Sequence, residues 1–589
     1  MIVGPLLVLL TWLVAAAVIV VLGYLPAIAA QFRPAISTTF RHAIWWGLGI
    51  AVLFTLTINL LLPLRSAFTA AAFLGATVVI GALGFIAMRA RQLQQIRLVL
   101  RGIPFMTWLL LGALLVGVIY LAVAALGPVT NYDTGLYHLG AIGYAGDYST
   151  ITGLASLHSP FGYGTSQFPL AAILGNGPWD GVGYRLLNGL LMLLLVIELA
   201  VRVASRTYFV GTYILLVGVL AAWVPMIALS DYWMTSPTSD SAVFLVTIVS
   251  GAYLADALWR ENEWRASGSV SLILALVLFT LRPLMAFYLI GVVLVLVARA
   301  IHLRRAGRHV SGGRIGWFLV AAFALCFGFV QSARDYLLSG WLQYPLSIFA
   351  FNIPWRAPDP INERTATLGN ARDPANLWDA AKNWDWIPAW VGRLPNQWET
   401  YEFLALAAGA VVALLMVARA KRSIRIRALA LAMFPSTLTV LVWFLASPPS
   451  FRFAWGPIFS LGTIPIGWAL FSVARPKAGK HRDRDPLFRM VVSGFVAVTV
   501  LLVGYCSLAR LDLASMSERR TWALGPMNIG YLVTPLPLVE TTEQGLASGL
   551  IVRVPVKGEN CWGVFPMCVP RISQSVGPRS DSIQGGFLP

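Results

Sequence analysis

The chain has 589 residues, of which 58% are hydrophobic and only 12% are charged. This balance excludes an ordinary soluble globular protein, because such a chain needs far more polar surface to cover its cores. The formal net charge of +18 would suggest nucleic-acid binding in a soluble protein. Here the Arg and Lys residues cluster between hydrophobic runs, so we expect a membrane protein whose partner is the lipid bilayer and not a nucleic acid.

The hydrophobic runs are continuous and long enough to cross a bilayer as helices, which takes about 20 residues. Lipid-exposed backbone must satisfy its own hydrogen bonds, and a barrel would show short alternating segments instead. We therefore expect an all-α polytopic membrane protein with about 13–14 transmembrane helices. The expected spans lie near residues 2–24, 43–63, 67–88, 104–126, 184–201, 207–229, 241–258, 268–302, 315–334, 403–420, 427–446, 454–473 and 487–508.

Two of these runs have special features. We expect the run from Val3 to Leu22 to be a true first span and not a cleaved signal peptide. The stretch 268–302 is interrupted by Arg282-Pro283. Because proline ends or kinks a helix, we expect a first helix too short for a full crossing, followed by a longer returning helix.

The distribution of basic residues predicts the orientation. They recur in alternate connections, at Arg33 and Arg41, within 89–101, at Arg202 and Arg206, and within 299–308, 419–427 and 475–484. Positively charged connections face the cytoplasm. We therefore expect a transmembrane domain of residues 1–508 whose long loops, 127–183 and 335–402, are extracytoplasmic. The tail 509–589, which is polar and holds the β-like run GLIVRVPV, is expected on the same side as a small appendage.

Cys561 and Cys568 form a close pair in the tail segment CWGVFPMC. In an oxidising compartment such a pair predicts a local disulfide, and the alternative is two free thiols. A zinc site is not expected, because no histidine lies near enough to complete one.

Asp133 lies a few residues past the fourth expected span, in the first long loop. A carboxylate at the membrane surface can act as a general base on an acceptor hydroxyl. The neighbouring aromatic side chains suit sugar faces and hydroxyls; those taken as candidate sugar or acceptor contacts are Tyr132, Tyr137, His138 and His158. The alternative is an interfacial aromatic belt with a helix-capping aspartate.

Asp240 and Arg282 are the other charges that draw attention. Asp240 ends the loop SDYWMTSPTSD and is either a second acid near the pocket or a helix N-cap. Arg282 stands where a half-helix ends, and a charge at that depth is costly and usually functional or paired. Because the planar guanidinium matches phosphate, we expect Arg282 to hold the phosphate of a lipid-linked donor; the alternative is an ion pair with an acid.

Weaker candidates lie at other ends of the spans. Arg185 and Arg452 could also contact phosphate or sugar, although arginines that snorkel at helix ends are common. Tyr344 and Trp355 could line a donor or acceptor groove, and interfacial packing is the alternative. No P-loop, GxSxG or HExxH motif occurs, so nucleotide-driven pumping lacks support.

Several short strings resemble a known group of proteins. The chain is similar to the GT-C-fold membrane glycosyltransferases, and more closely to a poorly characterised group of bacterial GT-C-like membrane proteins. The matching strings are YDTGLYHL (132–139), LHSPFGYGTSQFP (157–169), SPTSD (236–240), SGWLQYP (339–345), SPPSFRFAWGP (447–457) and ENCWGVFPMC (559–568).

The resemblance implies a function. It implies a GT-C-like bundle in the bacterial cytoplasmic membrane, with an active site that faces outward and Asp133 as catalytic base. The donor would be a polyprenyl-phosphate sugar, and the acceptor a cell-envelope glycan, glycolipid or protein. Family members with a metal carry paired acids in the first loop, whereas Thr134 follows Asp133 here. We therefore expect a metal-independent, inverting transfer without a cofactor, and a divalent metal is the alternative.

Two other functions remain open from the sequence. A transporter or flippase of a lipid-linked saccharide would use the same arginine and aromatic groove without forming a bond. It needs comparable access from both sides, whereas the polar mass is nearly all on one side. A non-catalytic subunit for envelope assembly would tolerate substitution of Asp133 or Arg282.

Overall fold

A computed structural model of the chain describes residues 3–31, 36–87, 103–307, 314–420, 425–474, 486–509 and 532–589. Within these ranges, 14 helical segments are long and apolar enough to cross a membrane, which confirms the expected all-α polytopic fold. The long helices are α1 (Val3–Ala29), α2 (Ile36–Asn59), α3 (Ala67–Ala87), α5 (Phe105–Ala124), α9 (Leu187–Ala204), α10 (Val210–Trp223), α12 (Ser239–Trp259), α13 (Trp264–Leu281), α14 (Ala286–Arg305), α15 (Arg314–Ser339), α19 (Trp398–Arg419), α20 (Ile426–Ala446), α21 (Trp455–Val473) and α22 (Pro486–Ala509).

The interrupted stretch differs from its expected form. Helix α13 begins at Trp264, four residues before the expected run, and extends over 18 residues. At a rise of about 1.5 Å per residue it reaches about 27 Å, so the expectation of a helix too short to cross was wrong. Arg282 and Pro283 lie between α13 and α14, and both helices count among the candidate spans.

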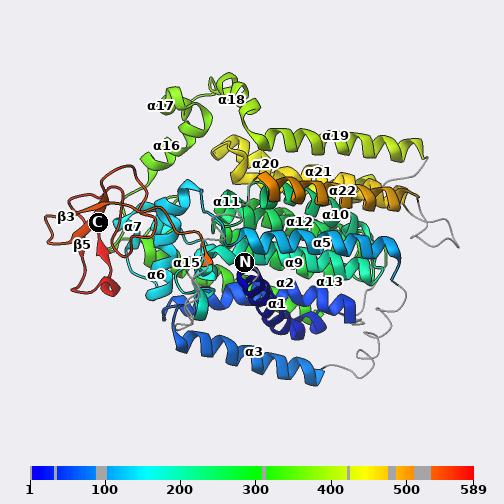
Figure 1. Cartoon of the computed structure of the whole chain (residues 1–589), viewed down its shortest axis with the longest axis horizontal. Coiled ribbons are helices and arrows are strands. Elements are labelled where there is room, and N and C mark those ends of the chain that lie inside the picture. The colour runs from blue at the N-terminus through cyan, green and yellow to red at the C-terminus, as the bar shows by residue number, and fades with distance from the viewer. Residues whose placement is uncertain are drawn as a thin grey trace.

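Helix α12 occupies the centre of the bundle. All residues of its most apolar stretch are buried, whereas only 11% of the residues in the corresponding stretch of α19, at the periphery, are buried (Figure 1). A helix that is apolar all round can be buried on every side, and α12 packs against α9, α10, α13 and α21. Because α12 begins beside Arg282 and extends away from it, its first turn belongs to one end of the bundle and its last turn to the other.

Short elements gather at the end of the bundle where α12 begins, which we call the loop end (Figure 1). They come from residues 127–186, 224–238, 283–285, 340–397 and 451–454, and from the tail. In chain order they are η1 (Thr134–His138), α6 (Leu139–Asp147), α7 (Leu154–Leu157), η2 (Ser159–Gly162), α8 (Gln167–Ile173), η3 (Gly177–Trp179), η4 (Gly183–Leu186), η5 (Val224–Ala228), α11 (Ser230–Trp233), η6 (Pro283–Met285), β1 (Trp341–Gln343), β2 (Ile348–Ala350), α16 (Ile361–Arg372), η7 (Pro374–Asn376), α17 (Leu377–Ala380), α18 (Ile387–Arg393), η8 (Leu394–Asn396) and η9 (Phe451–Ala454).

The tail folds back on the first loop. Its elements are β3 (Thr541–Gly545), β4 (Ile551–Pro555), β5 (Gly577–Pro578), η12 (Ile583–Gly585) and β6 (Phe587–Leu588). The β-like run predicted from the sequence forms β4, which pairs antiparallel with β3. Backbone bonds tie the tail to the bundle, from Thr534 N–H to the Leu126 carbonyl (2.8 Å) and from Phe587 N–H to the Thr152 carbonyl (2.9 Å).

At the end of the bundle opposite the loop end, several charges are buried within the helices. Arg41 and Arg202, expected as connecting-loop cations, lie in α2 and α9 and are 3% and 0% exposed. Arg202 pairs with Glu198 (2.6 Å) and Asp256 (2.5 Å). The expected basic segments 89–101 and 475–484, with Arg33, Lys421 and Arg422, lie outside the described residues.

Candidate functional site

Two ion pairs meet at the loop end, and we call them together the paired-charge site. Nη1 of Arg452, in η9, lies 2.8 Å from Oδ2 of Asp133. Arg282, between α13 and α14, pairs with Asp240 in the first turn of α12. Nη1 of Arg282 donates to the carbonyl oxygen of Arg452 (3.1 Å), so one hydrogen bond joins the two pairs. Four candidate residues from separate parts of the sequence therefore come together.

A single aromatic ring organises the two guanidinium groups. The Cζ atoms of Arg282 and Arg452 each lie 5.0 Å from the centre of the Phe453 ring. Attraction between a cation and the ring face contributes about 0.5–2 kcal/mol per contact, depending on desolvation. Phe453 therefore stabilises both positive charges of the paired-charge site.

The two ion pairs differ in access. The Asp240 side chain is 3% exposed and that of Arg282 is 16% exposed, whereas Asp133 and Arg452 are 22% and 29% exposed. The Asp133–Arg452 pair is thus the part of the paired-charge site that a ligand can reach first. Arg282 forms an ion pair with an acid, which was the alternative to binding a phosphate. Asp240 is not the N-cap of α12, because Thr238 holds that position.

The residues after Asp133 form a short π-helix, η1. Asp133 directly precedes η1, but its side chain makes no capping hydrogen bond, so it does not act as the helix cap that was the alternative to a catalytic role. Its backbone N–H donates to Oδ1 of Asn131 (3.0 Å). The hydroxyl of Thr134 is 2.7 Å from the hydroxyl of Ser236, which ties η1 to the segment before α12. The Asp133 backbone is therefore held from both sides.

His138 is buried and Tyr137 is half-buried beside the paired-charge site. Burial lowers the pKa of His138 to about 4, although the negative charge of Asp133 acts in the opposite direction. Burial also raises the pKa of Tyr137, and the Asp133 charge adds to that rise. Both side chains are consequently neutral near pH 7.

The low pKa of His138 predicts a pH-dependent stability. Between pH 6.5 and 4 the unfolded chain binds a proton at this ring and the folded chain does not, so stability falls as pH falls through that window. The full loss is about 3 kcal/mol. We expect His138→Phe to reduce this acid-induced drop in Tm, measured at pH 7.5 and pH 5. The exposed His302 supplies the control, His302→Phe. An equal drop in all three proteins would contradict the assignment.

Other predicted site residues lie apart from the paired-charge site. Arg185 is buried, and its guanidinium donates to the carbonyls of Gly127 and Thr534, which fastens the tail. The Tyr344 hydroxyl is 2.7 Å from that of Ser159. Tyr344 approaches the site only through rings, from Tyr344 to Tyr163 (6.2 Å) and from Tyr163 to Tyr137 (5.8 Å).

Trp355, Tyr132 and His158 are engaged elsewhere. Trp355 donates to the Tyr336 carbonyl (3.2 Å) and carries a tail arginine over its ring. The Tyr132 hydroxyl donates to Glu559 (2.7 Å), and this bond is the main cause that raises the Tyr132 pKa to about 12. Burial lowers the pKa of His158 to about 4, and its ring packs against Phe161.

Two acids at the start of α19 were not anticipated. Glu399, in the first turn of α19, is close enough to interact electrostatically with Arg452 and Asp240. Both carboxylate oxygens of Glu402, one turn further, are buried without a hydrogen-bond partner in the described part of the chain. Their signal in the sequence is the string WETYEF at the start of a span, since acids at that position are rare unless they serve a purpose.

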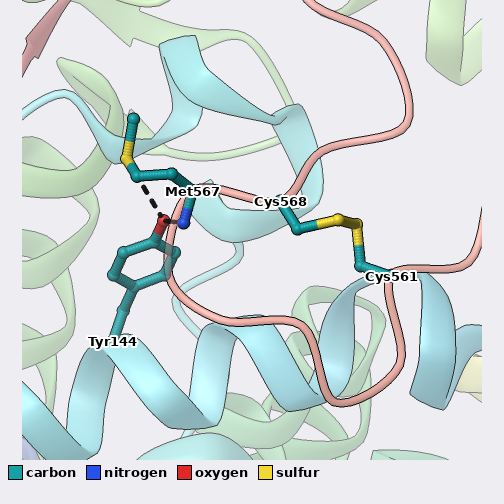
Figure 2. The surroundings of a disulfide bond; sticks show 4 residues. All are labelled: Tyr144, Cys561, Met567 and Cys568. Carbon is teal, nitrogen blue, oxygen red and sulfur yellow. Dashed lines mark hydrogen bonds between the residues drawn. A yellow bond between two sulfur atoms is a disulfide. The ribbon is translucent and has the colours of Figure 1, made fainter. Parts of the chain in front are cut away.

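The tail turn closed by the disulfide sits directly on η1. The expected Cys561–Cys568 disulfide is present. The backbone N–H groups of Cys561 and Trp562 both donate to the Gly135 carbonyl, at 2.9 and 3.0 Å. Figure 2 shows the other side of this turn, where the Tyr144 hydroxyl meets the backbone N–H and the sulfur of Met567, at 3.1 and 3.8 Å. The tail thus braces the helix turn that follows Asp133.

Gly135 tests the importance of this contact. A Cβ atom at Gly135 would lie 2.6 Å from the Trp562 ring, so the tail approaches only because no side chain is there. We expect Gly135→Ala to lower stability by about 1–3 kcal/mol, measured as a lower Tm. Gly112→Ala in α5 is the control, because nothing lies within 4 Å of its Cβ position. Equal Tm values for the two variants would count against the bracing role.

Metal binding has no visible basis in the part of the chain that the structure describes. No group of three or more His, Cys, Asp or Glu side chains there could hold a metal ion. The metal-independent mechanism remains a prediction.

These features define a class: an all-α polytopic membrane protein with a paired-charge site at one end of its bundle. A family model described as a domain of unknown function (DUF8201) matches residues 6–459, and the chain belongs to that family. The match includes all four residues of the two ion pairs and ends before the tail. No curated protein matches the chain, and no solved structure matches it either.

Proposed function

We propose that the chain is a membrane glycosyltransferase that moves a sugar from a polyprenyl-phosphate donor to an acceptor hydroxyl. The observation that carries the proposal is the pairing of Asp133 with Arg452, 2.8 Å apart, beside a second guanidinium from Arg282. Guanidinium groups bind phosphate through charge-assisted, forked hydrogen bonds. A carboxylate within reach of the same arginines can serve as the base.

The ion pairs suggest how the donor prepares the base. A donor phosphodiester carries one negative charge and competes with Asp133 for Arg452, the more exposed arginine. When the phosphate takes Arg452, Oδ2 of Asp133 loses its ionic partner and becomes free to accept a proton. Arg282 stays paired with buried Asp240 and adds positive charge behind the phosphate.

The reaction balances without a cofactor. The acceptor oxygen forms a bond to the anomeric carbon of the sugar, and the bond from that carbon to the phosphate oxygen breaks. The electron pair leaves with the polyprenyl phosphate, whose new charge the two arginines stabilise. The acceptor proton passes to Asp133. Direct displacement inverts the anomeric centre.

The location follows from the same proposal. We place the loop end on the extracytoplasmic face of the bacterial cytoplasmic membrane, where lipid-linked donors and envelope acceptors meet. The Cys561–Cys568 disulfide supports this, because disulfides persist in oxidising compartments. The basic residues at the other end of the spans support it through the positive-inside rule.

The test uses the purified full chain with a panel of polyprenyl-phosphate sugars and envelope-derived acceptors. We expect the free polyprenyl phosphate and the glycosylated acceptor to appear together, measured by mass spectrometry. The transporter alternative predicts movement of labelled donor across proteoliposome membranes with its glycosidic bond intact. Donor transport without either cleavage product would overturn the enzymatic proposal.

A further inference from the structure

Residues 377–393, which form α17, α18 and the turn between them, expose an apolar surface, and we call this segment the tryptophan arm. Trp384, just before α18, and Val391 within it are each 48% exposed. The exposed residues of α18 are all apolar: Ile387, Pro388, Val391 and Gly392. Ile387 and Val391 are four residues apart and therefore lie on the same helical face. An exposed face without a polar side chain marks a surface that contacts lipid or protein.

The other side of the tryptophan arm packs on the end of α20. Three of its rings surround the ring of Phe444, with centroids 6.2, 5.7 and 5.8 Å away (Trp384, Trp386 and Trp390). Phe444 lies two residues before α20 ends at Ala446. Because α20 is a candidate span, the arm lies at the level where this helix would leave the membrane.

The apolar surface of the arm adjoins the parts of the bundle that face lipid. Only 11% and 28% of the residues in the most apolar stretches of α19 and α20 are buried. Leu441 and Leu445 of α20, within one turn of Phe444, are each 55% exposed. Figure 1 shows α17 and α18 outside the group of other short elements, beside the start of α19 at the periphery. A bilayer that surrounds α19 and α20 therefore reaches the arm.

The composition of the arm favours a lipid surface over a charged partner. Its two acids and two bases cancel, so electrostatic attraction to a charged macromolecule has no basis there (Asp379, Lys382, Asp385 and Arg393). Tryptophan combines an apolar ring with one polar N–H group, and it is enriched where a membrane meets water. The arm holds four tryptophans within 17 residues, a density that suits this boundary.

We propose that the tryptophan arm lies in the headgroup layer of the membrane leaflet at the loop end, with Trp384, Ile387 and Val391 inserted among the acyl chains. Amphipathic elements of this kind insert their apolar face by about 5–10 Å. Removal of these three side chains from water drives the insertion, and it requires no anionic lipid. The contact with lipid does not depend on glycosyl transfer.

The arm also reaches towards the paired-charge site. Nε1 of Trp390 donates to the carbonyl oxygen of Pro449 (2.7 Å), three residues before Arg452. Trp443 of α20 donates to the next carbonyl, that of Ser450 (3.0 Å). The inserted arm thus holds the segment that carries Arg452 close to the lipid headgroups, where the phosphate of a lipid-linked donor lies. Only this consequence rests on the proposed function.

The test places the fluorescent label NBD on the full chain in phosphatidylcholine nanodiscs. Cys326 and Cys506 are replaced by alanine, so that Val391→Cys carries the reactive thiol while the disulfide stays closed. We expect lipids with a nitroxide near the headgroup to reduce the emission of this label about twofold. The control is Thr542→Cys, exposed on β3 in the tail and away from the bundle, whose emission should not change (Figure 1).

A second variant separates insertion of the arm from the affinity of the label for lipid. In a protein labelled at Ile387→Cys, Val391→Asp should restore the emission, because a carboxylate resists transfer out of water, whereas Thr542→Asp should leave the quenching unchanged. Three results would overturn the proposal: no quenching at residue 391, quenching that persists with Val391→Asp, or disulfide cross-links between two chains at residue 391 in place of quenching. Sugar transfer is measured separately, so an inactive protein with a quenched arm would refute the proposed function alone.

Discussion

Asp133→Asn should lower the rate of sugar transfer by about 100- to 10,000-fold, the usual contribution of a positioned general base. Asparagine preserves the size of the side chain but cannot accept the acceptor proton. It can still accept a hydrogen bond from Arg452, so we expect the local fold and donor binding to persist. Turnover is measured as free polyprenyl phosphate, and donor binding by co-purification of the lipid followed by mass spectrometry.

The control for this variant is Asp147→Asn. Asp147 lies in the same loop, but it is 40% exposed and pairs with Arg65 instead of an arginine of the paired-charge site. We expect its turnover to equal that of the wild type. Equal turnover in Asp133→Asn and wild type would remove Asp133 from the chemistry. A matching loss in both variants would indicate that the loop needs its net charge and not a base at residue 133.

The spans were predictable because their signal is local. A run of about 20 apolar residues identifies itself without knowledge of its neighbours. The main error was the predicted start of α13, which was placed too late in the sequence. Its first turn contains Trp264 and Arg265 and is not apolar. That turn is nonetheless helical, because the Trp264 side chain packs in the interior, and hydropathy alone does not reveal this contact. A helix boundary in a polar stretch depends on contacts that a sequence window does not include.

The site was predictable in its members but not in its pairing. Asp133, Asp240, Arg282 and Arg452 each stand out as charges at the ends of spans. Their partners do not, because Asp133 and Arg452 are 319 residues apart in the sequence. The bracing of η1 by the tail was missed for the same reason. Gly135 has no signal of its own until Trp562 is known to lie against it.

The same limit applies at the end of the bundle opposite the loop end. Arg41 and Arg202 look like ordinary cytoplasmic cations, because a basic residue near the end of a span is the usual orientation signal. The structure instead places both around Glu198, which lies inside the apolar run of α9. An acid within such a run was the available clue, since intramembrane charges are rarely left unpaired.

Glu198 is where we expect the largest loss of stability. Its Oε1 lies 2.6 Å from Arg202 Nε and 3.5 Å from Arg41 Nη1, and it accepts a hydrogen bond from the Tyr253 hydroxyl (2.9 Å). Its Oε2 accepts from the Trp45 indole (3.2 Å). Glu198 and Arg202 are both fully buried. One carboxylate therefore pairs with two cations and accepts hydrogen bonds from two neutral donors.

Glu198→Ala should accordingly cost about 3–5 kcal/mol, because it removes the acid that pairs with Arg41 and one of the two acids that pair with Arg202 in the described part of the chain. We expect a strongly reduced Tm and a poor yield of folded protein. Glu198→Gln keeps the hydrogen-bond acceptor and removes the charge, so it separates the two contributions. Glu263→Ala is the control: Glu263 also pairs with an arginine, but that pair is about 30% exposed and worth about 1 kcal/mol or less. If Glu198→Ala were no worse than Glu263→Ala, the buried charges would have to be compensated by relaxation of α2 and α9 towards solvent, which hydrogen exchange at the ends of those two helices would detect.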